Sequence, residues 1–309
     1  MNGFWVQTLH QAVIAGTPLA LAGLGELLAE TVGVLNLGVE GMMLIGAVTA
    51  YATALVTGNL WIALTAGALA GSLFGLLHAF LTVTLRVNQI AIGLTLVFLG
   101  AGLSGYAGQS IAGAPVAQSF ETVAIPGFGA LPVVGPILFR QDWVVYGAGL
   151  LGVAVWVFLR FTATGLNLRA TGEDPAAADA AGVPVVAIRY LATIAGGALA
   201  GVAGGYFSLA VAHAWADQIT GGQGWIALSL VIASNWKPLR LICFSLLFGI
   251  VDSLYFSLQA LGTDFPSSIL AMVPYVFTLV VLAIGIAWRK ELGVGPAMLG
   301  RPYDREERI

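Results

Sequence analysis

The chain has 309 residues, of which 59% are hydrophobic and only 9% are charged, and its formal net charge is −3. Soluble domains carry about 25% charged residues, so this composition predicts an integral membrane protein. Its apolar stretches are long and rich in Gly, Ala, Leu and Val, which excludes an alternating β-barrel and predicts an all-α fold, a polytopic transmembrane helical bundle. No basic cluster is large enough for nucleic acid, and the lone Cys243 excludes an internal disulfide and a thiolate metal site.

Apolar windows of about 20 residues, the length that crosses about 30 Å of hydrocarbon, predict about 8–10 membrane segments, some of them discontinuous. These windows are 9–28, 38–57, 61–85, 89–108, 143–160, 187–211, 224–236, 239–261 and 267–288. Window 224–236 is short, which indicates a half-helix or a start deeper in the membrane. Residues 109–142, rich in Pro and Gly, form either an external loop or a re-entrant hairpin. We treat residues 1–309 as one transmembrane domain.

A polar stretch lies where the first two windows meet. Residues 29–47 carry Glu30, Asn36 and Glu40 between glycines, and Glu26 lies just upstream. Carboxylates and amides at membrane depth are costly unless they face protein or water, so they indicate a transport pathway. The glycines permit a broken helix, which is tolerated at that depth where the backbone lines a cavity. An ordinary surface loop between two helices would also explain these residues.

Basic residues predict the orientation of the bundle. They gather at four junctions that fall on one side when the windows are counted: Arg86; Arg160, Arg169 and Arg189; Lys237 and Arg240; Arg289, Lys290, Arg301, Arg305 and Arg308. The positive-inside rule makes this side cytoplasmic. It therefore holds a loop of about 161–189 and a C-terminal tail of about 289–309. The N-terminus then lies outside, unless 109–142 contains a further helix.

Two apolar windows share a glycine pattern. The run Gly-Ala-Leu-Ala-Gly occurs twice and each copy extends to a third glycine, at Gly67, Gly71 and Gly75 and at Gly197, Gly201 and Gly205. Glycines four residues apart lie on one helical face and allow a close approach of backbones. The two helices run in opposite directions in the predicted topology, as in an inverted repeat, although a match this short also arises by chance.

The predicted cytoplasmic loop contains a short helical stub. Asp174 is suited to cap a helix, Pro175 to its first position, and Gly182 to the residue just past its end. The stub, 175–181, is about two turns long and needs packing to hold it. It is either an ordinary connector or a docking element for a cytoplasmic partner.

Three further polar residues are candidates for the pathway. Asn88 and Gln89 open a window directly after Arg86, where they either cap the helix or line the path. Asp252 lies inside window 239–261, where a carboxylate faces a bundle or a cavity, as a structural hydrogen-bond partner or as part of the path. No nucleophile with a nearby base is evident, so the sequence does not predict an enzyme.

Four stretches together carry a resemblance to a known family. They are GVLNLGVEGMML at 33–44, NQIAIGLTL at 88–96, LRATGEDPAAADAAGV at 168–183 and GGQGWIALSLVIASNWKP at 221–238. The chain resembles the membrane subunit of an ABC importer. It is similar to the branched-chain amino acid/ribose/nucleoside permease family and closest to its nucleoside-type members. The resemblance runs from about residue 10 to 290.

The resemblance implies an inner-membrane permease that works with partner chains. These are a second permease subunit, usually a paralogue, two cytoplasmic ATPases that bind ATP and Mg, and an extracytoplasmic substrate-binding protein. The stub becomes the coupling helix, with Glu173, Asp174, Pro175, Ala177 and Gly182 at the ATPase. The sequence itself lacks the G-x-x-x-x-G-K-[ST] phosphate loop. We therefore expect no cofactor in this chain. The expected transport pathway consists of Asn36, Glu40, Asn88, Gln89 and Asp252.

Two departures from the nucleoside-type pattern affect the expected substrate. Val97 stands where these relatives commonly have Asn, and Gly222-Gln223-Gly224 stands where they often have Gly-Arg-Gly. Sugars and branched-chain amino acids therefore remain alternatives to a nucleoside. A different class, an ion-coupled secondary transporter with Glu30, Glu40 or Asp252 as a proton relay, is the other hypothesis from the sequence.

Overall fold

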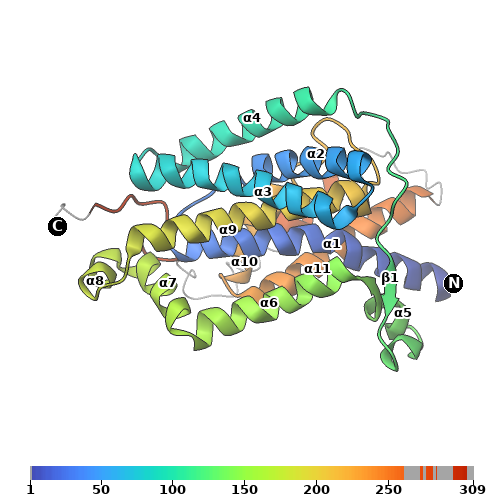
Figure 1. The fold of residues 1–309 in the computed structure, drawn as a ribbon. Helices are drawn as coiled ribbons and strands as arrows, with labels where there is room; N and C mark the ends of the chain where they lie inside the picture. Colours follow the sequence, from blue (N-terminus) through green and yellow to red (C-terminus); the bar gives the residue numbers. More distant parts are fainter. Residues whose placement is uncertain (1, 261–271, 274–275, 281–282, 284–294, 305–309) are drawn as a thin grey trace.

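The computed structural model describes residues 2–260, 272–273, 276–280, 283 and 295–304. Within them, seven helical segments are long and apolar enough to cross a membrane (Figure 1). These are α1 (Asn2–Thr31), α2 (Val39–Thr57), α3 (Leu60–Ala79) with the π-helical turn η1 (Phe80–Thr84), α4 (Gln89–Gly108), α6 (Trp143–Phe161), α9 (Val185–Tyr206) with η3 (Phe207–Val211), and α11 (Pro238–Ala260). The predicted transmembrane bundle is confirmed. Window 267–288 falls mostly outside the described residues.

Three shorter helices also belong to the described part of the bundle. They are α7 (Ala163–Glu173), α8 (Pro175–Ala180) and α10 (Gln223–Ser234). Helix α10 has only 12 residues, too few to cross a bilayer. It therefore confirms that window 224–236 is a half-helix.

Residues 109–142 lie outside the bundle, at the end where α1 begins (Figure 1). Strands β1 (Thr122–Ala124) and β2 (Arg140–Asp142) pair antiparallel, with Val123 opposite Gln141. Between them lie η2 (Phe128–Ala130) and α5 (Val134–Leu138). His10 in α1 is 2.9 Å from the carbonyl oxygen of Pro136, which ties this cap to the bundle. A loop at this end of the bundle is therefore what forms, and not a hairpin that re-enters the bundle; that this end is external stays a prediction.

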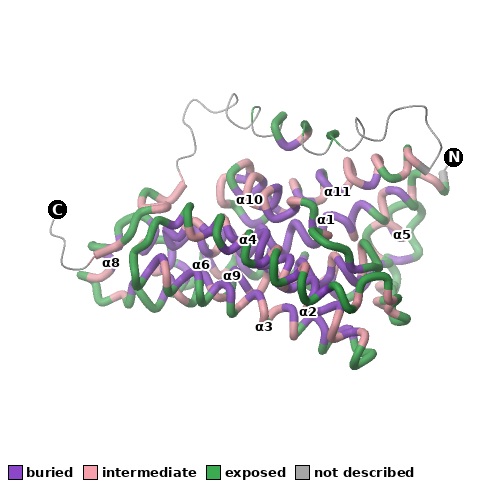
Figure 2. Tube along the Cα trace, turned by 90° about the horizontal axis from the view of Figure 1, so that it is seen from above, coloured by how far each residue is buried: buried purple, intermediate pink, exposed green. Residues whose placement is uncertain are grey.

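Helix α1 is the most enclosed of the long helices. It packs against α9, α10, α11 and α6, and its apolar window is mostly buried, whereas that of α4 is mostly exposed. Figure 2 shows the buried residues gathered along the middle of the bundle. A helix whose middle is mostly apolar on every side is suited to this central place, and the outer helices turn their free apolar faces outward.

The two glycine runs pack directly against each other and form what we call the glycine seam of α3 and α9. A Cβ atom built on Gly71 would overlap the carbonyl oxygen of Gly197, and one on Gly201 would overlap that of Gly67. The pairing of 67 with 201 and of 71 with 197 makes the helices antiparallel. The predicted close packing and opposite directions are confirmed, because a side chain at these positions would have no room.

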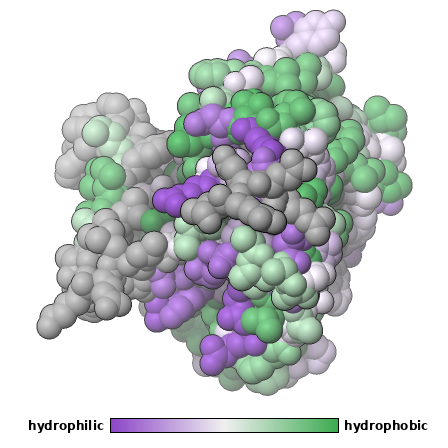
Figure 3. Space-filling model, turned by 90° about the vertical axis from the view of Figure 1, so that its left-hand side faces the viewer, coloured by the Kyte–Doolittle hydropathy of each residue, from purple (hydrophilic) through white to green (hydrophobic). Residues whose placement is uncertain are grey.

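The basic junctions, within the described residues, share one end of the bundle, opposite the described N-terminal residues (Figure 1). Of the fourth junction only Arg301 is described, and Arg289, Lys290, Arg305 and Arg308 lie outside the described residues. Arg86, after α3, pairs with Asp304, and a cavity of about 720 Å³ is lined by Arg160, Arg169 and Arg240 together with Pro296. Figure 3 shows that hydrophilic residues gather on this end. The shared end agrees with the count from the sequence. That this end is cytoplasmic stays a prediction.

Candidate functional site

The chain between α1 and α2, which we call the break, is a buried connection at which the chain reverses direction (Figure 1). It is neither an interruption within one helix nor a surface loop, so the predicted broken helix is wrong here. Residues 32–38 connect the end of α1 to the start of α2, and the Leu35 carbonyl oxygen lies 3.2 Å from Nε2 of His78, near the end of α3. All residues of this connection are buried or half-buried. A Cβ on Gly38 would lie 3.2 Å from that of Leu96. Leu96 lies seven residues after the start of α4, which is about 10 Å of helix. The polar stretch therefore lies inside the bundle.

Side chains from neighbouring helices satisfy the backbone of this break. The amide of Asn36 donates to Glu26 Oε1 at 3.1 Å, and that of Leu35 donates to Gln89 Oε1 at 2.7 Å. The amide of Gly38 donates to Asn36 Oδ1 at 3.2 Å. Buried backbone groups outside helices need such partners, because an unpaired one costs free energy comparable to a lost hydrogen bond. These polar side chains hold the broken chain in place.

Glu40, in the first turn of α2, holds the start of the half-helix α10. Its Oε1 accepts hydrogen bonds from the Thr220 hydroxyl at 2.5 Å and from the Gly222 amide at 2.9 Å. Its Oε2 accepts one from the Gly224 amide at 2.6 Å. The first amides of a helix have no partner within it and carry partial positive charge, so a carboxylate there is favourable. The start of α2 and the start of α10 thus meet at one buried side chain.

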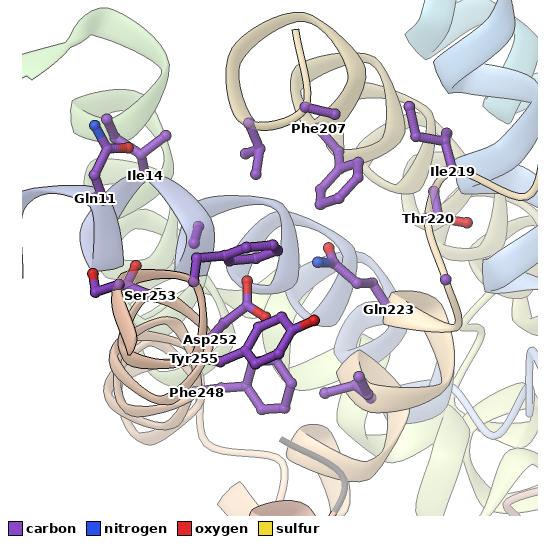
Figure 4. Close-up of a pocket in the computed structure, with 17 residues that line it drawn as sticks. Gln11, Ile14, Phe207, Ile219, Thr220, Gln223, Phe248, Asp252, Ser253 and Tyr255 are labelled. Carbon is purple, nitrogen blue, oxygen red and sulfur yellow. The ribbon is translucent and has the colours of Figure 1, made fainter. Parts of the chain in front are cut away.

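A cavity of about 760 Å³ lies beside this junction. Its walls come from α1, η3, α11 and residues 219–223, which we call the wall segment (Figure 4). Asp252 from α11 and Gln223 from the wall segment point into it (Figure 4). The Oε1 atom of Gln223 is buried and has no hydrogen-bond partner among the described residues. Aromatic rings complete the lining, from Phe207, Phe248, Tyr255 and Phe256.

The predicted pathway residues take different positions relative to this cavity. Asp252 lines it, and Glu40 lies behind the wall segment, joined to it through Thr220. Asn36 and Gln89 hold the break. Asn88 is exposed, and its Oδ1 accepts from the Ala91 amide at 3.0 Å at the start of α4, which is the capping alternative. A role in transport stays a prediction for all five.

Sequence reasoning missed several residues of the cavity. Gln11 lines it from α1, and Thr220 and Gln223 line it from the wall segment. Gln223 stands in the Gly-Gln-Gly departure from the expected pattern, so it carried a signal. Gln11 lies in the first third of α1, and no pattern distinguishes it from an interfacial residue.

The helical stub forms as its residues predict. The Asp174 side chain accepts from the Ala177 amide at 2.9 Å, Pro175 is the first residue of α8, and Gly182 follows at φ +84°. Helix α8 ends at Ala180, one residue earlier than expected. Helix α7, which ends at Glu173, precedes it and was not predicted. Glu173, Asp174, Ala177 and Gly182 are all exposed at the end of the molecule (Figure 1).

These features define a class of protein. A helical membrane bundle with a half-helix, a buried polar connection between α1 and α2, a cavity beside the point where α2 and α10 meet and an exposed stub at its basic end is a transport subunit in architecture. The family described as branched-chain amino acid transport system, permease component, matches residues 8–286. The chain therefore belongs to this family.

Curated relatives narrow the resemblance. The chain is 39% identical to the putative glucose ABC transporter permease protein TsgC13 of Haloferax volcanii, over 96% of this chain and 97% of the relative. It is 32% identical to the guanosine ABC transporter permease protein NupQ of Bacillus subtilis, over 96% of each. It is 34% identical to the nucleoside ABC transporter permease protein NupC of Lactococcus lactis, over 88% and 90%. No solved structure matches the chain.

The family decides between the two classes that the sequence left open. The chain is the transmembrane subunit of an ABC importer, a multi-pass protein of the inner membrane, and not a self-sufficient ion-coupled transporter. Permeases of this kind are transport subunits and not enzymes, and they work with ATP-binding subunits and a substrate-binding protein. The four stretches that carried the resemblance therefore pointed to the correct family.

Proposed function

We propose that this chain forms one half of the translocation path for a nucleoside, with a paralogous permease subunit as the other half. The cavity beside Glu40 carries the proposal. Its aromatic rings suit a purine base, which stacks on Phe or Tyr side chains. Gln223 and Asp252 offer a hydrogen-bonding amide and a carboxylate for ribose hydroxyls. Mostly apolar walls with a few placed polar groups are usual for small-molecule sites.

The names of the relatives support a transported solute that contains a hydroxylated ring. Two of them are named for guanosine or nucleosides and one for glucose. Hydroxylated rings are common to all three names. The glucose-named relative makes a sugar the second candidate, and the experiment below includes it.

The basic end of the bundle is the cytoplasmic side in this proposal, and the C-terminus lies there. Its basic residues agree with the positive-inside rule. The exposed residues of α8 and its flanks then form the contact with the ATPase, with Glu173, Asp174, Ala177 and Gly182 available to a partner. ATP and Mg bind to that partner, and this chain supplies the path.

The test is uptake by the complete importer in proteoliposomes, with its permease partner, ATPases and substrate-binding protein. We expect ATP-dependent uptake of labelled guanosine that excess unlabelled nucleoside suppresses. Replacing Gln223→Leu should lower the maximal rate about tenfold, the size of a lost polar contact of about 1.4 kcal/mol. Cys243→Ala, an exposed position on the same cavity-lining helix α11, is the control and should leave uptake unchanged.

Two outcomes would contradict the proposal. Uptake of glucose but not guanosine would assign the chain to sugars. Guanosine uptake at the same rate without ATP would contradict ATP hydrolysis as the energy source.

A further inference from the structure

The described C-terminal residues 295–304, which we call the C-terminal strap, lie across the basic end of the bundle (Figure 1). On one side they contact α7 and α8. The amide of Met298 donates to the Gly172 carbonyl at 2.9 Å, and the Tyr303 hydroxyl donates to Asp179 Oδ2 at 3.1 Å. Asp179 belongs to α8, the stub with the exposed residues. The strap thus holds the docking element from within the same chain.

On its other side the strap contacts the start of the α1–α2 break. The amide of Gly300 donates to the carbonyl oxygen of Gly33 at 3.1 Å. Arg189, which is only 1% exposed, joins the same two segments, because its Nε donates to the Val32 carbonyl at 3.1 Å and its Nη1 donates to the Arg301 carbonyl at 3.4 Å. Its guanidinium also lies over the Tyr303 ring, 6.0 Å from the centroid. The break is therefore fastened to the strap at its first two residues.

A third attachment fixes the end of the strap to the turn after α3. Asp304 forms an ion pair with Arg86 through both carboxylate oxygens. Fork-like pairs of this kind fix geometry as well as adding energy. Because the pair is partly exposed, its direct contribution to stability is small. Its value lies in setting where the strap ends.

These contacts form a continuous route from the docking stub to the cavity. Helix α8 packs mainly on α7 and α9. The C-terminal strap links α8 to the α1–α2 break. The break leads into α2, where Glu40 holds Thr220 of the wall segment. Coupling between distant sites is carried by such chains of hydrogen bonds and packed elements. Each link in this route is a contact of the described residues.

We propose that the C-terminal strap is a positioning element of the transport cycle, which carries the displacement of α8 to the α1–α2 break and so to the wall of the cavity. The proposal rests on the docking of α8 proposed above. Tyr303 and Asp304 are its positioning residues, since neither touches the cavity. The strap makes the ATPase contact and the break move together.

The test uses the complete importer and a double variant, Tyr303→Phe with Asp304→Asn. This removes the hydroxyl donor to Asp179 and one charge of the ion pair, while the aromatic ring stays over Arg189. We expect the number of substrate molecules taken up per ATP hydrolysed to fall about fivefold, the effect of about 1 kcal/mol on a coupling network. Copurification of the ATPase should be unchanged.

Two further variants make the result decisive. Arg86→Gln breaks the same ion pair from the α3 side and should lower the ratio in the same direction. Arg301→Gln is the matched control, because its side chain is exposed and its link to Arg189 is through the backbone carbonyl; it should keep the wild-type ratio.

A wild-type ratio in the double variant would overturn the proposal. So would a parallel fall of uptake and ATP hydrolysis, because that is what a merely structural role produces. Hydrogen exchange of the amides at 33–38 gives a readout that does not depend on the energy source. It should be about fivefold faster in the double variant, and an unchanged rate would count against the strap. If the wild-type permease did not copurify with the ATPase, the proposed docking of α8 would be refuted instead.

Discussion

Two regions of this molecule hold its helices together by opposite means. In the glycine seam, α3 and α9 meet backbone to backbone, and Gly71 and Gly201 each lie against the carbonyl of a glycine on the other helix. At the junction around Glu40, the start of α2 and the half-helix α10 meet through three hydrogen bonds to one carboxylate. The seam is apolar and has no free space, whereas the junction is polar and adjoins a cavity.

The difference separates the part that stays fixed from the part that is able to rearrange. Close-packed backbones allow no intermediate positions, because the repulsion between overlapping atoms is steep. Hydrogen bonds to a carboxylate are exchangeable for water when a cavity is adjacent. We therefore infer that the seam is the rigid frame and the junction the moving part, and the following predictions test this contrast.

The largest effect is expected in the seam. Gly71→Leu should prevent the approach of α3 to α9 and cost about 3 kcal/mol or more, because overpacking forces the backbones apart. The measurement is the midpoint of thermal unfolding in detergent. Gly102→Leu on α4 is the control, since a Cβ there would have no heavy atom within 4 Å. Equal stability of both variants would show that the seam is not a frame.

The second prediction concerns the docking of the ATPase on α8, and its variant leaves both the seam and the junction unchanged. Asp174→Lys with Gly182→Val should abolish ATP-driven uptake while the protein still inserts and folds. The lost cap costs about 1 kcal/mol, and Val is strained at the positive φ of Gly182. The measurements are uptake and ATPase copurification. Unchanged values for both would refute docking by α8.

The third prediction concerns the moving part. Glu40→Leu leaves three donors without their acceptor, two of them buried at a cost of about 1–3 kcal/mol each and the third, the Gly222 amide, half-buried. We expect the maximal uptake rate to fall about tenfold or more, with little change in the concentration for half-maximal uptake, since Glu40 does not line the cavity. Glu40→Gln keeps the shape and one acceptor oxygen, so its maximal uptake rate should lie between those of the wild type and Glu40→Leu. A full rate in Glu40→Leu would remove this junction from the transport cycle.

The smallest effect is expected at Asn36. Its side chain accepts one hydrogen bond, from the Gly38 amide, and its amide nitrogen contacts the Met42 sulfur at 3.5 Å. Asn36→Leu should lower the maximal uptake rate about fivefold, because one neutral hydrogen bond contributes about 1 kcal/mol. Uptake kinetics for this variant beside Glu40→Leu rank the two contributions. A larger loss for Asn36→Leu than for Glu40→Leu would reverse the assignment of the main link.

The sequence by itself determined the features that depend on nearby residues. The membrane spans follow from apolar runs of about 20 residues, and the short window 224–236 already indicated the half-helix α10. Asp174, Pro175 and Gly182 predicted the ends of α8 because capping acts within a few residues. The glycine spacing predicted close packing, and four stretches at their spacing indicated the family.

Only the tertiary structure decided which distant residues meet. Glu40 and Thr220 are 180 residues apart, and Tyr303 and Asp179 are 124 apart. No local pattern specifies such pairs, since they depend on how every intervening helix packs. For the same reason the sequence could predict that both glycine runs pack closely but not that they pack against each other. It could mark Asp252 and Glu40 alike as polar residues at membrane depth, whereas the packing of α11 and α2 places one in the cavity and the other behind its wall.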